Sequence, residues 1–114
     1  MSTLTERLKE YGADTDGAMS RFLNDEELYL SCLEQFVDDP GFFALEEAIA
    51  SDDHQTAFDA SHMLKGVAAN MGLTPMFSAL SAVVEPLRRK EYAGINELYA
   101  QVAAQRAALK KITD

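Results

Sequence analysis

A histidine, a lysine and a glycine stand close together in the middle of the sequence, at His62, Lys65 and Gly66. Residues three and four apart on an α-helix share a face, so these three are expected over one surface patch. The imidazole offers a nucleophilic ring nitrogen, the lysine offers a positive charge, and the glycine leaves space. A mid-helix glycine costs about 1 kcal/mol relative to alanine, so it needs a reason. Room for a bulky anionic group on the imidazole is one such reason.

The same residues also allow less specific interpretations. Gly66 could instead permit two helices to pack closely. Asp59, one turn before His62, could either orient the ring nitrogen or repel an incoming anion. The second histidine, His54, follows two aspartates at a predicted helix start and is expected to be solvated and without function. The two histidines are two turns apart and offset around the helix, so we predict no metal site.

The elements that must position this patch are all helical. Apolar residues recur at helical spacing along the whole sequence, and short polar connectors separate the segments. The helix that contains His62 is expected to run from about residue 53 to 71, with its apolar stripe facing a core and His62 facing away. We therefore predict an all-α protein, an antiparallel four-helix bundle with a short additional N-terminal helix or helices.

Helix boundaries are marked by residues with known end preferences. Thr3 with Glu6, and Asn24 with Glu27, form the pattern of a capping box and predict two helix starts. Pro86 falls near the end of a predicted helix and is expected to kink or loosen its last turn.

Composition limits the class of protein. The 114 residues fit a single domain, residues 1–114, and the net charge of -9 argues against nucleic acid and anionic membranes as partners. One cysteine, Cys32, excludes an internal disulfide and is expected to be buried. The sequence begins without a signal-peptide pattern and contains no run long enough to span a membrane, so we expect a cytoplasmic protein.

The segment from His62 to Gly72 resembles a known family motif. Its first five residues, His-Met-Leu-Lys-Gly, are similar to the motif of histidine-containing phosphotransfer (HPt) domains, and small residues and a second glycine follow. The resemblance implies that His62 carries a phosphoryl group between receiver-domain aspartates in a two-component phosphorelay. It also implies that Lys65 lies near the phosphoryl oxygens and that Gly66 leaves space for them.

The resemblance further implies how the chain works with its partners. The expected partners are response-regulator receiver domains, a hybrid histidine kinase, or both. The receiver would bring its own Mg²⁺, so this chain is expected to need no cofactor and to be a carrier rather than an enzyme. Four residues near His62 are predicted to contact a partner: Phe58, Met63, Ala69 and Leu73. The alternative is a phosphorylation-independent helical adaptor that binds a signalling partner.

Overall fold

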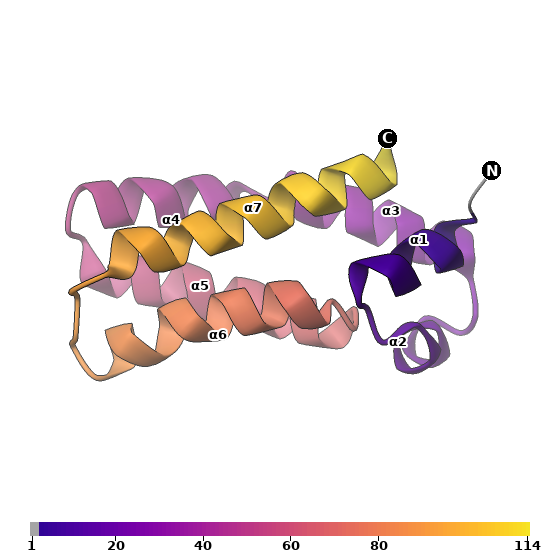
Figure 1. Ribbon diagram of the computed structural model, residues 1–114, viewed down its shortest axis with the longest axis horizontal. Helices are drawn as coiled ribbons and strands as arrows, with labels where there is room; N and C mark the ends of the chain where they lie inside the picture. Colours follow the sequence, from indigo (N-terminus) through magenta and orange to yellow (C-terminus); the bar gives the residue numbers. More distant parts are fainter. Residues whose placement is uncertain (1–2) are drawn as a thin grey trace.

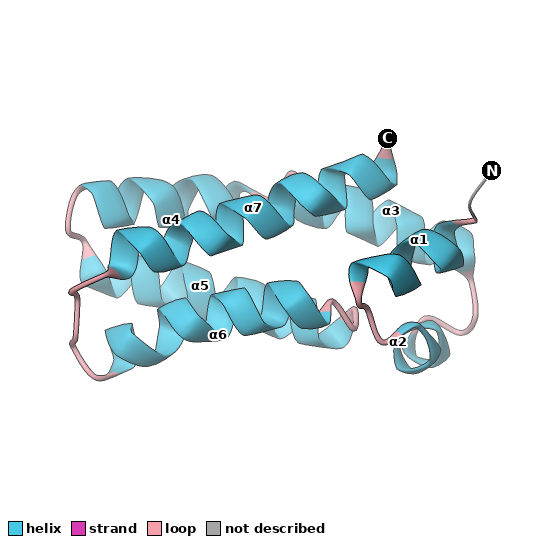
Figure 2. Cartoon of the chain, viewed as in Figure 1, coloured by secondary structure: helices cyan, strands magenta, loops and turns pink. Residues whose placement is uncertain are grey.

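A computed structural model describes residues 3–114 and shows that this part of the chain is helical, without strands (Figure 1, Figure 2). The helices are α1 (Leu4–Tyr11), α2 (Thr15–Arg21), α3 (Glu26–Val37), α4 (Pro40–Ala50), α5 (His54–Asn70), α6 (Thr74–Arg88) and α7 (Ile95–Thr113). None of these helices is both long and apolar enough to cross a bilayer. The prediction of an all-α fold is confirmed.

Helices α4 to α7 form the four-helix bundle, and the short helices α1 and α2 lie across one end of it (Figure 1). Helix α5 packs mainly against α4 and α6, α6 packs against α7, and α3 packs against α7. Helix α3 is followed directly by α4, which runs on in roughly the same direction (Figure 1). The helical backbone is interrupted between them, where Pro40 occupies the first turn of α4. The break is capped by Asp39, whose carboxylate accepts a hydrogen bond from the Gly41 N–H.

Two predicted helix starts had different outcomes. The hydroxyl of Thr3 accepts a hydrogen bond from the Glu6 N–H at 3.1 Å, which confirms the start of α1. The start predicted at Asn24 was wrong by one residue, because Asn24 adopts a left-handed conformation with φ 58°. The cap of α3 is Asp25, whose carboxylate accepts from the Leu28 N–H at 3.0 Å.

Pro86 was predicted to kink or loosen the last turn of its helix, and it lies within α6. Helix α6 continues through Pro86 to Arg88. The carbonyl of Pro86 accepts a hydrogen bond from the Glu91 N–H at 2.8 Å, so the chain leaving the helix closes over this turn.

Helix α5 is set between two well-defined ends. Asp53 caps its start by accepting a hydrogen bond from the Thr56 N–H at 3.2 Å. Its buried residues recur at helical spacing and face the core: Ala57, Ser61, Leu64 and Ala68. His62 lies outside this stripe and is exposed. The predicted range of about 53–71 therefore agrees with the observed helix and its two cap residues.

The end of α5 is held by the N-terminal part of the chain. Four consecutive carbonyls, at residues 69–72, each accept a hydrogen bond from residues 14–29, and we call this set the α5 latch. Its bonds are Arg21 Nη2 to Ala69 O (3.3 Å), Arg21 Nε to Asn70 O (2.6 Å), Tyr29 Oη to Met71 O (2.7 Å) and the Asp14 N–H to Gly72 O (2.8 Å). These donors satisfy carbonyls that a helix end leaves without intrahelical partners.

The buried phenol of Tyr29 makes the latch sensitive to alkaline pH. Burial raises the pKa of Tyr29 to about 12, and the nearby charge of Arg21 opposes part of that rise. Because the pKa is higher in the folded chain than its ordinary value near 10, the stability it contributes is complete below about pH 10. We expect that contribution to be lost as the pH rises through about 12.

Urea unfolding at pH 8, 10 and 11 measures this effect, with Tyr29→Phe as the control. At pH 8 the variant should be less stable by about 1 kcal/mol, because it lacks the hydrogen bond to Met71. The difference between the two chains should shrink at alkaline pH. Equal losses in both chains between pH 8 and 11 would contradict the assignment.

Candidate functional site

His62 stands at the centre of α5 with its side chain exposed. Neither ring nitrogen makes a hydrogen bond to another described residue, so both remain open to solvent or to a reactant. The aromatic ring of Phe58, one turn earlier, stacks on the imidazole, with ring centroids 5.6 Å apart and an angle of 19° between the planes. The imidazole is therefore supported on one side and open elsewhere, as a nucleophile on a protein surface must be.

Lys65 provides positive charge on the same face. Its Nζ lies 5.6 Å from the centre of the Phe77 ring, on α6, in a cation–π contact. No ion pair joins it to a carboxylate within residues 3–114, so its charge stays available to an anion. His62 and Lys65 are three residues apart on one helix, which places their side chains over neighbouring surface.

Gly66 opens the surface beside His62. A Cβ atom built at Gly66 would meet no atom within 4 Å, other than the backbone of its own helix. Close packing between helices therefore does not explain this glycine, and that alternative is ruled out. What the glycine leaves is unoccupied space one turn from the imidazole.

Substitution of Gly66 should separate stability from function. We expect Gly66→Ala to raise the free energy of unfolding by about 1 kcal/mol, because alanine favours the helix and meets no neighbour. Gly66→Leu should also fold, yet it should slow the acceptance of a phosphoryl group on His62 by about tenfold or more, because its side chain fills the free space. Urea unfolding and phosphorylation by the small donor phosphoramidate measure the two effects. An unchanged rate in Gly66→Leu would show that the space is not used.

The orienting role predicted for Asp59 has no hydrogen bond to support it. Asp59 Oδ1 accepts from Gln55 Nε2 at 2.9 Å, which draws the carboxylate toward the start of α5. The contact with the ring of His62 comes from Phe58 instead.

The residues predicted to contact a partner divide into surface and core. Met63 is 44% exposed, Ala69 is exposed, and Phe58 is half-buried beside His62. Leu73 is fully buried, so its predicted role in docking was wrong. It precedes α6 in the turn after α5, where its side chain belongs to the hydrophobic core.

Three further residues near the site make aromatic contacts that were not predicted from the sequence: Arg88, His54 and Tyr92. The guanidinium of Arg88 lies 5.3 Å from the centre of the Phe58 ring. His54 is not simply solvated, because its ring stacks on Tyr92 at 3.5 Å and 4°. The spacing of four between Phe58 and His62 was a usable signal for their contact. The contacts of Arg88 and Tyr92 join different elements and left no signal in the sequence.

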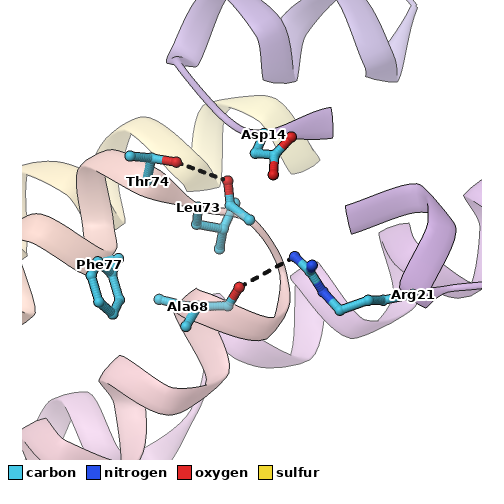
Figure 3. A pocket seen from close by; sticks show the side chains of 8 residues that line it. Asp14, Arg21, Ala68, Leu73, Thr74 and Phe77 are labelled. Carbon is cyan, nitrogen blue, oxygen red and sulfur yellow. Dashed lines mark hydrogen bonds between the residues drawn. The ribbon is translucent and has the colours of Figure 1, made fainter. Parts of the chain in front are cut away.

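A shallow cavity of about 260 Å³ lies beyond Ala69, between α2 and the turn that joins α5 to α6 (Figure 3). The polar groups at its wall are already used. Arg21 donates to the end of α5, and the Asp14 carboxylate accepts from the Gly17 N–H at 3.2 Å. We interpret this cavity as a gap left between the elements that the α5 latch joins, rather than as a ligand site.

Metal ligands do not gather in the described part of the chain. No group of three or more histidine, cysteine, aspartate or glutamate residues lies there in a position to hold an ion. Cys32 was predicted to be buried, but it is half-buried.

Comparison with known proteins gives the family of this chain. The model of the Hpt domain family matches residues 42–111, which include α5, α6 and nearly all of α4 and α7, so the chain belongs to that family. Hpt domains act as phosphotransfer carriers in His–Asp phosphorelays, without catalytic domains, and interact with receiver domains and histidine kinases. Searches among curated proteins and among solved structures gave no match.

Proposed function

We propose that His62 is the phospho-accepting residue of this Hpt domain and that the chain carries a phosphoryl group between receiver-domain aspartates. The observation that carries the proposal is the exposed imidazole at the centre of α5, beside the free space at Gly66. The unpaired charge of Lys65 supports the same function. The second histidine, His54, has neither a glycine nor a lysine three or four residues away on its helix.

The transfer step forms its covalent bond to one group of this chain, the His62 imidazole. A neutral ring nitrogen of His62 attacks the phosphorus of an aspartyl phosphate, and a P–N bond forms as the P–O bond to the aspartate breaks. The electron pair of that bond stays on the aspartate, which leaves as a carboxylate. Catalysis of such a transfer rests on positioning and on charge stabilisation. We assign the positive charge to Lys65 and expect the receiver to bring Mg²⁺.

The exposed residues around His62 are those that a partner would contact. Met63 and Ala69 are both exposed and follow His62 along α5, and both stay predicted contacts. We propose response-regulator receivers, a hybrid histidine kinase, or both as partners, and the cytoplasm as the location. A carrier must release its receiver after each transfer, so the interface should be small, about 1,200 Å² or less.

A two-step label transfer tests the proposed function. Receiver domains from the source organism are phosphorylated with a labelled donor, purified, and mixed with this chain in the presence of Mg²⁺. The label should appear on the chain, should be lost in acid and kept in alkali, and should pass on to a second, unlabelled receiver. Phosphoramidate serves as a donor that needs no docking. Absence of label from every receiver and from phosphoramidate would support the adaptor alternative.

A further inference from the structure

Phe58 lies between the acceptor histidine and a cation of the neighbouring helix. Its ring stacks on His62 at 5.6 Å, and the guanidinium of Arg88, from the last turn of α6, lies 5.3 Å from the ring centre. Arg88 is itself held by Glu85, with its Nε 3.4 Å from a carboxylate oxygen. The three side chains Arg88, Phe58 and His62 form a continuous array that we call the α5–α6 stack.

We propose that Phe58 is a positioning residue for phosphoryl transfer, which fixes the orientation of the His62 imidazole, and that Arg88 keeps Phe58 in place. This inference rests on the proposed function of His62. It assigns Phe58 a role inside the site, in addition to its predicted contact with a partner.

The need for such a support follows from the exposure of His62. On a helix, an exposed imidazole without a hydrogen bond within the chain can occupy about two χ1 wells, because the third clashes with the preceding turn, and each well allows roughly two ring orientations. In-line attack on phosphorus requires one of them, since transfer depends on the alignment of the reacting atoms. Contact with a neighbouring ring favours the orientation in which the two planes lie nearly parallel, which is the 19° arrangement observed.

Phe58 is suited to this role because it cannot easily move. It is half-buried and packs against the hydrophobic core, so the core restrains the inner side of its ring. Arg88 restrains it from the α6 side through a cation–π contact. The two neighbouring carboxylates have partners: Asp59 accepts from Gln55, outside the stack, and Glu85 pairs with Arg88, a member of the stack.

The experiment compares four variants with the wild-type chain. Phe58→Leu removes the ring, Phe58→Tyr keeps it, and Arg88→Gln removes the cation from an exposed position. Phe22→Leu is the matched control, since Phe22 is a half-buried phenylalanine whose ring contacts Tyr29 in another part of the molecule. For each chain, NMR measures the χ1 couplings of His62 and the ring-current shifts of its imidazole protons. Phosphorylation rates are measured with phosphoramidate and with a phosphorylated receiver.

We expect Phe58→Leu to lower the rate about fourfold with both donors, because the productive fraction of His62 falls to one orientation among about four. Its His62 couplings should become averaged. Phe58→Tyr and Phe22→Leu should resemble the wild type in both measurements. Arg88→Gln should give a smaller change in the same direction, of about twofold, which keeps the test valid if Phe58→Leu does not fold.

Three results would overturn the inference in distinguishable ways. If the wild type is phosphorylated and Phe58→Leu keeps its rate and its His62 couplings, the positioning role fails and the proposed function stands. If Phe58→Leu loses rate with the receiver but not with phosphoramidate, Phe58 acts in docking alone. If the wild type accepts no phosphoryl group from either donor, the proposed function fails first and the positioning role fails with it.

Discussion

A His62→Gln chain should accept no phosphoryl group, whereas a His54→Gln chain should accept it at the wild-type rate. Glutamine has about the length and polarity of histidine but no ring nitrogen that can form a P–N bond. The effect should therefore be a complete loss of acid-labile label from a phosphorylated receiver. The matched His54→Gln change removes the other histidine of the chain, which stacks on Tyr92.

The loss has to be separated from any loss of folding. The His62 side chain is exposed, so its replacement should change the free energy of unfolding by no more than about 0.5 kcal/mol. Circular dichroism and urea unfolding of both variants provide that check. Acid-labile label that persists in a folded His62→Gln chain, or disappears in the His54→Gln chain, would assign the acceptor elsewhere.

A Gly72→Ala chain should be destabilised by about 2–4 kcal/mol. Gly72 has φ +69°, a left-handed conformation that costs other residues roughly 1–2 kcal/mol. In addition, a Cβ at this position would stand 2.6 Å from the carbonyl oxygen of Asp14 and 3.1 Å from Cβ of Ala18. Relieving these contacts must displace α2 from the end of α5. The midpoint of urea unfolding measures the change.

Gly94→Ala is the control that separates the two causes. Gly94 is also left-handed, with φ +79°, but a Cβ there would meet only a carboxylate oxygen of Glu97, at 3.9 Å. This variant should lose about 1–2 kcal/mol, the conformational cost alone. Equal losses in the two variants would show that the close approach of Asp14 to Gly72 contributes nothing.

The helix that contains His62 could be predicted from the sequence because its signals are local. Asp53 caps it, small and apolar residues recur along its buried face, and Gly72 follows its end. The placement of His62 on the opposite, exposed face follows from helical spacing alone. The four-helix bundle then follows from the number of amphipathic segments and their short connectors.

What could not be predicted depends on contacts between elements. The burial of Leu73 is decided by the turn after α5, which carries it into the core rather than onto the surface. The cap of α3 moved to Asp25 because Asn24 takes a left-handed turn conformation that the capping pattern does not reveal. The contact of Arg88 with Phe58 joins residues thirty positions apart, through the packing of α6 on α5.

The position of His62 within α5 has a consequence for the energetics of a carrier. Eight helical residues stand on either side of it, so the N–H groups nearby are already bonded to carbonyls of the same helix. A phosphoryl group on His62 would thus be far from the free N–H groups of a helix start, which bind anions tightly. With little stabilisation beyond the P–N bond and the charge of Lys65, a phosphoryl group there would keep a high chemical potential. Because a carrier is regenerated in each cycle, the equilibrium constant for net transfer from one receiver to another is determined by the two receivers and not by this chain.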